Sequence, residues 1–317
     1  MGVARILAPA AILLGGCAMA ETTGGPGPKA DLPVLGTLWD WDDLAASEGR
    51  FREAAARGRA AGDEPYALEA DTQVARTMSL RDRFEEAHAI LDAVEQRLPS
   101  NPPAVRVRYL LERGRTLNSS GSPAKANPLF REAYGASRGA GLAVLALDAA
   151  HMVALVEEPE EALRWAYRAM EDAEASADRR ARGWLGPLYN NTGWTHYERG
   201  EFGKALDLWR KGVAVRQEMG ETDLRIGRRT VATGLRATGR PGDALDTLER
   251  IHREDPAANE ADGYWQEEMG ETLLLLGRRD EARPRFARAY EILRQDEWLA
   301  GHEAPRLERL RREGSAP

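Results

Sequence analysis

Residues 190–209 read NNTGWTHYERGEFGKALDLW, and this stretch decides the fold. It contains two helical patterns separated by Gly200, with Phe202 at the start of the second. Gly193 in the first pattern and Ala205 in the second are small, so two helix backbones can approach closely at these positions. Trp209 lies one helical turn after Ala205 and is large enough to fill the remaining space. The stretch therefore predicts a pair of packed helices.

The same pattern occurs in five other places along the chain. Each copy has an Ala near the start of its second segment and a bulky residue about one helical turn later. These alanines lie 36 to 43 residues apart, at Ala87, Ala126, Ala162, Ala205, Ala244 and Ala282. Twelve residues before them the chain always has a small residue: Ala75, Gly114, Ala150, Gly193, Ala232 and Gly270. A pattern with this period is typical of repeat proteins, in which helix pairs stack on their neighbours.

The turn within each pair also has a recurring composition. Four of the six copies have Gly five residues before the alanine, and Gly is the residue that most easily ends a helix in the left-handed conformation. Pro stands three residues before the alanine in three copies, and Pro suits the first position of a helix. We therefore expect the second helices to begin at Phe84, Pro123, Pro159, Phe202, Pro241 and Arg279.

This arrangement resembles the tetratricopeptide repeat. In residues 190–209 the family's spacing is matched by Gly193, Tyr197, Gly200, Phe202, Ala205 and Trp209. The resemblance covers about residues 66–295. It implies an all-α fold, a right-handed α-solenoid of about six helix pairs with capping helices at both ends. The repeats are longer than the roughly 34 residues usual in the family, so we expect extended helices or longer turns.

The two ends of the repeat region are expected to act as caps, because a solenoid needs polar terminal elements to stay soluble. Residues 37–65 read as an N-terminal cap or partial repeat, in which Phe51 and Ala54 match the second-helix pattern and Trp39 and Trp41 seal the end. Residues 296–317 read as a C-terminal capping helix and tail. The length of 317 residues suggests about two domains, but the repeats account for most of it as one solenoid.

The N-terminus has the composition of a targeting signal. Residues 1–20 combine Arg5, a short apolar stretch and small residues, which is the plan of a signal peptide. The segment Leu14-Gly15-Gly16-Cys17 resembles a bacterial lipoprotein signal with Cys17 as the lipidated residue, and we favour this interpretation. The resemblance implies an outer-membrane lipoprotein that faces the periplasm, since an Asp would usually follow the Cys of an inner-membrane one. The Gly- and Pro-rich residues 21–36 would then form a tether.

Two alternatives to lipidation remain open. Residues 18–20 read Ala-Met-Ala, which suits ordinary signal peptidase and would release a soluble periplasmic or secreted protein. The remaining alternative is a cytosolic protein whose start has been misjudged. If Cys17 is lipidated, the membrane contact is limited to that N-terminal lipid, because no later segment is apolar enough to span a bilayer.

Composition and motifs argue against reaction chemistry. The chain has 44 basic and 51 acidic residues and a net charge of −7, which makes a nucleic-acid partner unlikely in the absence of a strong positive field. A single Cys excludes a disulfide framework and a zinc site built on several thiolates. None of the common metalloprotease, hydrolase or phosphate-loop motifs occurs. We therefore expect no enzyme activity, no metal and no cofactor.

The resemblance implies a concave groove lined by residues of the first helices. Carried over position by position, the groove candidates are Arg76, Arg108, Arg115, His151, Asn190, Asn191, Trp194, Tyr197, Arg229, Arg236, Tyr264, Glu267 and Glu271. Arginines can pair with carboxylates, and aromatic residues are frequent binding hot spots. The alternative is that these side chains are solvated and hold no ligand.

The sequence thus predicts a non-enzymatic interaction module or scaffold of the cell envelope, which binds a peptide or protein segment in this groove. A second hypothesis is a structural component of an outer-membrane or pilus-type assembly that uses its caps or convex surfaces, which rests on analogy of fold alone. A remote third hypothesis is an enzyme with a site that no motif reveals. The identity of the partner and the oligomeric state are not encoded in any recognisable motif.

Overall fold

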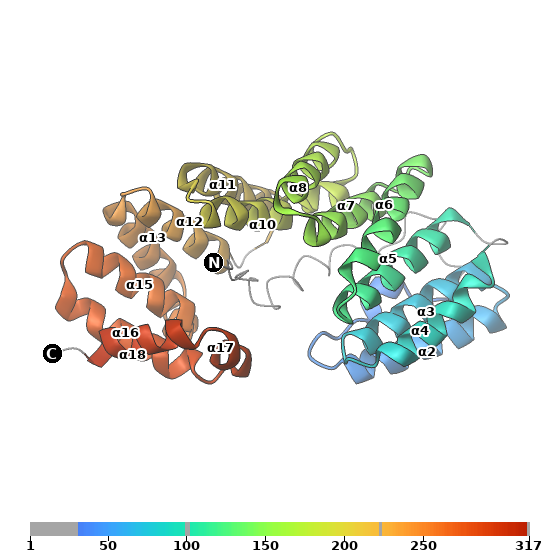
Figure 1. Ribbon diagram of the computed structural model, residues 1–317, viewed down its shortest axis with the longest axis horizontal. Coiled ribbons are helices and arrows are strands. Elements are labelled where there is room, and N and C mark those ends of the chain that lie inside the picture. Colours follow the sequence, from blue (N-terminus) through green and yellow to red (C-terminus); the bar gives the residue numbers. More distant parts are fainter. Residues whose placement is uncertain (1–30, 99–101, 222–223, 316–317) are drawn as a thin grey trace. The chain divides into compact units, whose positions relative to one another are not determined.

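The computed structural model describes residues 31–98, 102–221 and 224–315, and every regular element in these ranges is a helix (Figure 1). Cys17, the signal peptide and most of the proposed tether lie outside the described residues. The elements are η2 Leu35–Leu38, α2 Leu44–Ala60, α3 Glu64–Ser79, α4 Phe84–Glu95, α5 Pro103–Ser119, α6 Pro123–Gly139, α7 Ala143–Val156, α8 Pro159–Glu174, α9 Arg179–Gly183, α10 Leu185–Glu198, α11 Phe202–Glu218, α12 Arg225–Ala237, α13 Pro241–Glu254, α14 Pro256–Glu260, α15 Gly263–Leu275, α16 Arg279–Leu293, α17 Glu297–His302 and α18 Ala304–Ser315.

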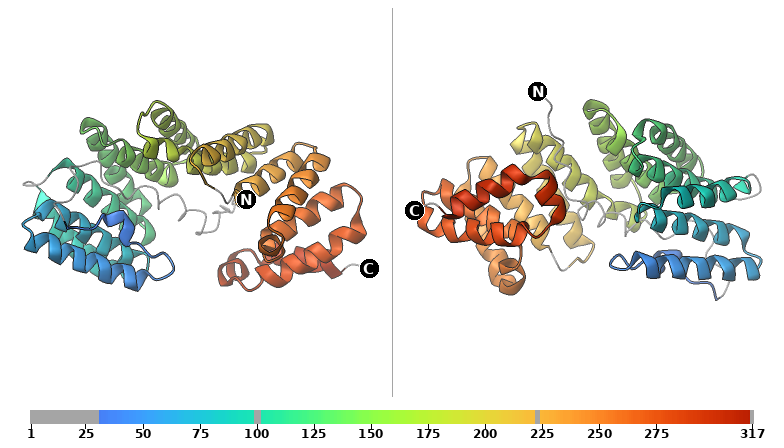
Figure 2. Two further views of the ribbon diagram at one scale, coloured as in Figure 1. Left: turned by 180° about the vertical axis from the view of Figure 1, so that it is seen from behind. Right: turned by 60° about the horizontal axis from the view of Figure 1, so that its bottom comes forward.

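The chain divides into two compact units, Met1–Leu188 and Tyr189–Pro317, which we call the N-terminal and C-terminal units. The division falls inside α10. In each unit, helices that follow one another in the chain pack side by side, as α5 does with α6 and α15 with α16 (Figure 2). Each unit therefore stacks helix pairs, and the predicted all-α solenoid is confirmed.

The second helix of every repeat begins where the turn pattern predicts. The helices α4, α6, α8, α11, α13 and α16 start at Phe84, Pro123, Pro159, Phe202, Pro241 and Arg279. The preceding turn at Gly200 has a φ of 74°, a conformation that Gly adopts without steric cost. The first repeat has Asp82 at the corresponding position, with a φ of 58°. Local sequence therefore sets these boundaries, and in the first repeat an Asp adopts the backbone conformation usually left to Gly.

The small residue of the first helix lies against the bulky residue of the second. A Cβ atom added to Gly193 would be 2.3 Å from Nε1 of Trp209, and one added to Gly114 would be 2.4 Å from Cε1 of Phe130. The rings occupy the space that a side chain on the glycine would need. The third repeat differs. Four residues after its alanine, Ala162, where the other repeats have the bulky residue, it has Ala166, and its buried bulky residue is Trp165, one position earlier. Ala162 itself is only partly buried.

Part of the extra length of the repeats lies in the connections between pairs. The short helix α9 leads from α8 to Trp184, which is 1% exposed, and α14 lies between α13 and α15. The helices of the six pairs are 12 to 17 residues long. In the repeats without such a connecting helix, α5, α6 and α11 each span 17 residues, so longer helices also contribute to the repeat length.

The ends of the described chain form further packed helices. Helix α2 packs against α3 as a second helix would, with Phe51 fully buried. The C-terminal segment contains two helices, α17 and α18, where the sequence suggested one. Helix α18 packs against α16 and buries Leu307 and Leu310. None of the helices in the described ranges has the length and apolar character needed to cross a membrane.

The contact between Gly114 and Phe130 can be tested by adding one methyl group. Gly114→Ala should lower the free energy of unfolding by about 1–3 kcal/mol, because a Cβ would overlap the Phe130 ring. Gly135→Ala is the matched control, since Gly135 lies inside α6 with nothing within 4 Å of its added Cβ. The control should gain about 0.5–1 kcal/mol from reduced backbone entropy. Urea denaturation followed by circular dichroism measures both, and equal effects would contradict the packing argument.

Candidate functional site

Most of the predicted groove residues lie on the face built from the first helices, which we call the first-helix face. In the N-terminal unit this face consists of α3, α5 and α7. Here Arg76, Arg108 and Arg115 are not solvated, since the first two are 7% and 4% exposed and the side chain of Arg115 is 11% exposed. Their burial makes an ionic partner within the protein energetically necessary.

The chain itself supplies these partners. Arg76 Nη1 donates to Glu112 Oε1 at 3.3 Å, and Arg115 Nη1 donates to the same oxygen at 2.6 Å. Arg115 also donates to Asp148 on the next first helix. The bonds form one buried chain of charges across α3, α5 and α7. Sequence reasoning missed Glu112 and Asp148, although each lies about one repeat length from an arginine that it pairs with.

His151 belongs to the same buried region and carries no charge at neutral pH. Burial lowers the pKa of His151 to about 4, with Asp148 opposing the shift and Arg115 adding to it. Its ring lies 5.8 Å from that of Trp184. Burial also acts on Asp148 and would raise its pKa, but the Arg115 guanidinium holds that pKa below its usual value. His151 is therefore a neutral interior residue, as is common for histidines on buried helix faces.

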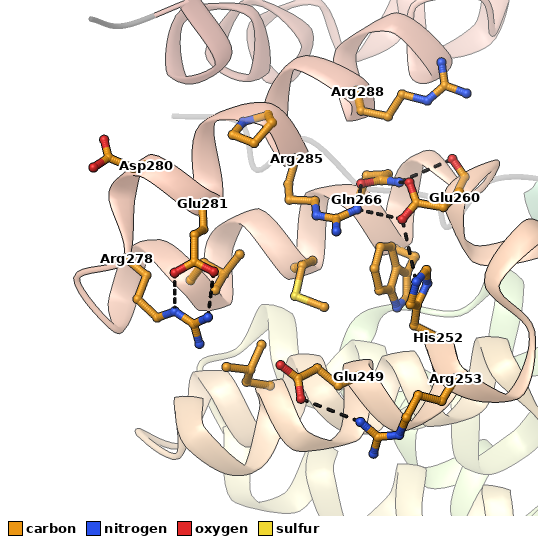
Figure 3. Close-up of a pocket in the computed structure, with 15 residues that line it drawn as sticks. Glu249, His252, Arg253, Glu260, Gln266, Arg278, Asp280, Glu281, Arg285 and Arg288 are labelled. Atoms are coloured by element: carbon orange, nitrogen blue, oxygen red, sulfur yellow. Dashed lines mark hydrogen bonds and ion pairs between the residues drawn. The ribbon is translucent and has the colours of Figure 1, made fainter.

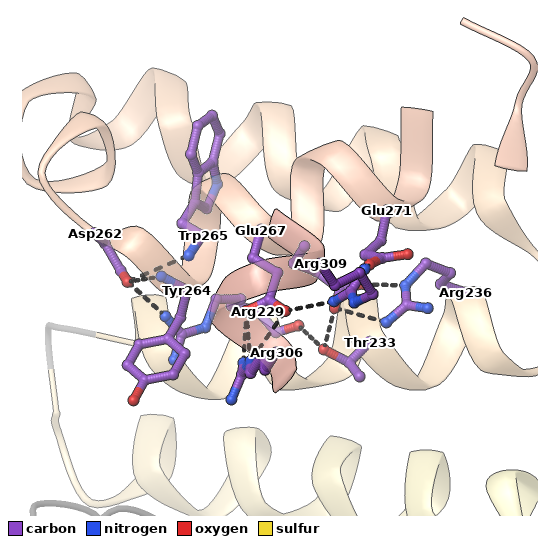
Figure 4. Close-up of polar contacts among 11 residues, drawn as sticks. Arg229, Thr233, Arg236, Asp262, Tyr264, Trp265, Glu267, Glu271, Arg306 and Arg309 are labelled. Atoms are coloured by element: carbon purple, nitrogen blue, oxygen red, sulfur yellow. Dashed lines mark hydrogen bonds and ion pairs between the residues drawn. The ribbon is translucent and has the colours of Figure 1, made fainter. Parts of the chain in front are cut away.

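In the C-terminal unit, α12, α15 and α18 hold a second ionic network (Figure 4). Arg229 Nη1 donates to both carboxylate oxygens of Asp262, at 2.8 and 2.6 Å. The Tyr264 ring lies against two guanidinium groups, with Arg229 Cζ at 5.2 Å and Arg306 Cζ at 5.3 Å from its centroid. Cations at these distances are attracted to an aromatic face. Tyr264 is thus held by its own chain on this face.

The acidic candidates Glu267 and Glu271 are paired with the C-terminal helix. Arg306 donates to both oxygens of Glu267, through Nε to Oε1 and through Nη2 to Oε2, and Arg309 Nη2 donates to Glu267 Oε1 at 2.9 Å. Arg309 also donates to Glu271. Helix α18 therefore neutralises the carboxylates of α15, as the first helix of a further pair would.

Arg236 makes the best-defined pair of this network. Its Nε donates to Glu268 Oε1 at 2.5 Å and its Nη2 to Glu268 Oε2 at 3.0 Å, while the Thr233 hydroxyl donates to Oε2 at 2.9 Å. Burial raises the pKa of Glu268 even though Arg236 opposes that rise. Glu268 keeps the pKa of Arg236 above its usual value, against the effect of burial. The network joins four arginines to four carboxylates: Arg229, Arg236, Arg306 and Arg309 with Asp262, Glu267, Glu268 and Glu271.

Asn190, Asn191, Trp194 and Tyr197 are brought together on α10 and are partly exposed. The Trp194 ring lies 4.8 Å from Trp209 and 5.5 Å from Tyr197. Asn190 Nδ2 donates to Asn191 Oδ1 at 3.2 Å, and the Asn190 carbonyl accepts a bond from Trp209 Nε1 at 3.1 Å. We call these four residues the aromatic–amide cluster. Among the predicted groove residues, it keeps uncharged polar groups within reach of solvent.

The opposite face of the C-terminal unit contains a hollow that sequence reasoning did not find (Figure 3). It encloses about 690 Å³ between α13, α15 and α16. Apolar residues lie at its base and charged residues around its rim. The buried apolar residues at the base are Leu245, Trp265, Met269 and Leu273. We call it the α13–α16 hollow. Its residues come from four helices, α13, α14, α15 and α16, which is why no local motif marks it.

The rim of the α13–α16 hollow is partly neutralised. Arg285 Nη1 donates to Glu260 Oε1 at 2.8 Å and its Cζ lies 5.2 Å from the Trp265 centroid, and Arg278 pairs with Glu281. Arg253 is two-thirds exposed and lies 3.8 Å from Glu249. Arg288 is exposed and forms no ion pair or hydrogen bond with any residue that the structure describes. Arg288 is thus available at the rim, and Arg253 is held only by the partly exposed Glu249.

A smaller hollow of about 300 Å³ lies on the other side of α13, between α11, α12 and α13. Arg210, Arg228, Arg250 and Glu254 line it together with Val213 and Val231. Helix α13 therefore contributes residues to both hollows, and arginines line each of them. Within the described ranges, no group of three or more His, Cys, Asp or Glu side chains is arranged to hold a metal ion.

Comparison with known proteins supports the fold. No model of a protein family matches the chain, and no curated protein matches it in sequence. Among solved structures, BtubC (BKLC) from P. vanneervenii superimposes with a TM-score of 0.57 at 18% identity, over 69% of this chain and 91% of BtubC. The apo quorum sensor NprR from B. thuringiensis gives a TM-score of 0.55 at 12% identity, over 87% of this chain and 83% of NprR.

A third similar structure is that of a protein with a tetratricopeptide repeat sensor. It is a signal transduction ATPase with numerous domains from Pyrococcus horikoshii that has a tetratricopeptide repeat sensor. Its TM-score is 0.53 at 14% identity, over 84% of this chain and 44% of that protein. These likenesses concern the fold alone. Together with the stacked helix pairs, they define the chain as a tetratricopeptide-like helical solenoid.

The pair of Arg236 and Glu268 can be tested with a double-mutant cycle. Arg236→Met should cost about 3–5 kcal/mol of unfolding free energy, because it leaves a buried carboxylate without its cation. Glu268→Met combined with Arg236→Met should recover most of that loss, since no buried charge then remains. Urea denaturation of the wild type, both single variants and the double variant gives the coupling energy. A double variant as unstable as the sum of the single variants would show that the pair is not coupled.

Proposed function

We propose that the protein is a non-catalytic interaction scaffold that binds a segment of another protein. The α13–α16 hollow carries this proposal. It combines an apolar base, a buried Trp and exposed arginines at the rim, and binding pockets typically pair an apolar lining with a few polar groups. Trp and Arg are also the residues most enriched in binding hot spots. Arg253 and Arg288 favour an acidic or carboxylate-bearing segment as the ligand.

In the C-terminal unit, the arginines of the first-helix face are less suited to binding a ligand, because they already pair with carboxylates of the chain. A carboxylate that bound Arg229 or Arg236 would have to displace Asp262 or Glu268. Each displacement would leave a partly buried carboxylate without a cation, which is energetically costly. A binding role on the face opposite to the predicted groove therefore agrees better with this geometry, and it also suits a scaffold within a larger assembly.

The aromatic–amide cluster supports a second binding surface. Asn190 and Asn191 can exchange hydrogen bonds with a peptide backbone, and Tyr197 and Trp194 offer aromatic surface beside them. The NprR structure also exists in complex with its cognate peptide NprX, with a TM-score of 0.50 to this chain at 13% identity. That complex supports the idea that a fold of this kind accepts a peptide.

We also propose that the scaffold is tethered in the bacterial cell envelope, as an outer-membrane lipoprotein facing the periplasm with a lipid on Cys17. The signal-like residues 1–20 and the Gly- and Pro-rich residues 21–36 support this location. Soluble export after cleavage at Ala20 is the alternative.

Charge reversal at the rim tests the binding site. Arg253→Glu with Arg288→Glu should reduce the partner recovered by crosslinking in intact envelopes at least tenfold, because both arginines are exposed at the rim and neither is held by a buried carboxylate. Arg164→Glu with Arg312→Glu is the matched control, with two exposed arginines elsewhere and the same change in net charge. Recovery is quantified by mass spectrometry of the captured proteins.

The same capture experiment discriminates between the two surfaces. Loss of the partner with Asn190→Ala and Asn191→Ala, combined with full recovery by the rim variant, would move the site to the aromatic–amide cluster. Equal recovery by the wild type and all variants would contradict both surfaces.

The location is tested separately. Growth with a labelled fatty acid should label the wild type, while Cys17→Ala should carry no label, because the thiol is the attachment point in such anchors. The measurement is the label on the purified protein. A wild-type protein that is unlabelled and begins at Glu21 would refute lipidation.

A further inference from the structure

The two hollows beside α13 occupy equivalent positions in successive repeats. The alanines Ala205, Ala244 and Ala282 of the second helices give the register. Relative to them, residues of the α13–α16 hollow have counterparts in the smaller hollow, which we call the α11–α13 hollow. The counterparts are Glu249 and Arg210, His252 and Val213, Gln266 and Arg228, Met269 and Val231, Arg285 and Thr247, and Arg288 and Arg250. Each hollow thus forms where a first helix meets the second helices on either side of it.

The two hollows differ in charge although their construction is the same. Four arginines and four carboxylates line the α13–α16 hollow: Arg253, Arg278, Arg285, Arg288, Glu249, Glu260, Asp280 and Glu281. Three arginines and one carboxylate line the α11–α13 hollow: Arg210, Arg228, Arg250 and Glu254. At one equivalent position the sign itself reverses, from Arg210 to Glu249. The smaller hollow is therefore the one that favours an anionic ligand group.

Two of its three arginines can accept a carboxylate without displacing one of the chain's own. Arg228 donates to Glu254 and is held by it. Arg210 is 45% exposed and lies 4.0 Å from Asp207, which is a weak contact on the surface. Arg250 is exposed and has no ion pair or hydrogen bond to any part of the chain that the structure describes. Arginine also binds carboxylates with two parallel hydrogen bonds, so these two side chains suit Asp or Glu residues of a partner.

The larger hollow is better suited to an apolar side chain. It encloses about 690 Å³, against about 300 Å³ for the α11–α13 hollow. Buried Trp265 and Met269 lie at its base, whereas the apolar lining of the smaller hollow is limited to Val213 and Val231. One ligand could therefore place an apolar residue in the first hollow and acidic residues in the second.

Helix α13 separates the two hollows and sets the spacing of such a ligand. A helix with its side chains is about 10–12 Å wide, and an extended chain spans about 3.3–3.6 Å per residue. A segment that crosses α13 thus needs about three or four residues between its two halves. Arg250 and Arg253 are three residues apart on α13, so they lie on the same side of it, and both are exposed.

We propose that the two hollows form one composite site, which binds an extended segment of a partner protein across α13. A bulky apolar residue of this segment lies in the α13–α16 hollow. Asp or Glu residues about three to five positions away pair with Arg210 and Arg250. The composite site includes the α13–α16 hollow and so rests on the proposed function, to which it adds a second contact surface and a ligand pattern.

Fluorescent peptides built to this spacing serve as probes. One has Leu-Phe-Leu, then Gly-Ser-Gly-Ser, then Glu-Glu-Glu, and a second has these parts in reverse order. Each is titrated into the full chain, and binding is followed by fluorescence anisotropy. The better of the two should bind at least tenfold more tightly than its versions with Gln for Glu or with Ser for Leu and Phe, because both halves contribute to one bound segment.

Charge reversal in the smaller hollow tests the acidic half. Arg210→Glu with Arg250→Glu should weaken binding of the better peptide at least tenfold and leave binding of its Gln version unchanged. Arg279→Glu with Arg312→Glu is the matched control, since both are exposed arginines of the C-terminal unit that line neither hollow. Circular dichroism checks the fold. Arg210→Gln with Arg250→Gln replaces the reversal variant if that one does not fold, with a loss of severalfold expected.

A photoactivatable leucine in the apolar half reports where that half binds. It should crosslink to α13, α15 or α16, as identified by mass spectrometry. Crosslinks there, with no effect of the changes at Arg210 and Arg250, would overturn the composite site and leave the α13–α16 hollow as the binding site. Crosslinks confined to other helices would overturn both. Failure of both peptides to bind at up to about 1 mM would overturn the composite site, and the capture experiment at Arg253 and Arg288 would then decide the proposed function alone.

Discussion

The structure depends on the contact between a small residue of each first helix and a large residue of the second. Gly114 under Phe130, Gly193 under Trp209 and Gly270 under Phe286 leave no room for a Cβ atom. The missing side chain lets the two helices approach, and the ring that fills the space fixes how they lie against each other. An isolated pair cannot bury its remaining apolar surface, so each pair must pack on the next. The repeat period and the stacking thus follow from this one constraint.

Stacking brings charged residues of adjacent first helices together, and most of them pair across repeats. Arg76 with Glu112, Arg115 with Asp148 and Arg236 with Glu268 each join residues 32 to 36 positions apart. Buried pairs of this kind contribute little net stability compared with apolar packing, but they penalise any register in which a charge lacks its partner. The ionic networks therefore favour one stacking arrangement over others.

This use of charge determines which surfaces remain available. The arginines of the first-helix face hold the chain's own carboxylates, and in the N-terminal unit Leu35, Trp39 and Trp41 contact α3 or α5 of that face as well. In the C-terminal unit, the opposite face keeps exposed arginines beside an apolar base. An interaction scaffold of this design would bind partners through surfaces that the internal networks leave free.

The sequence by itself determined the helix pairs, the first residue of every second helix and the turn at Gly200. These features depend on neighbouring residues and on a fixed spacing, so they are visible without coordinates. The candidate site was predicted less completely. The candidate residues lie on the first helices, but the partners of their arginines, Glu112, Asp148, Asp262 and Glu268, come from other repeats or from outside the motif. Only the tertiary structure decided that these charges are paired and where the hollows lie, because both depend on how one repeat is rotated against the next.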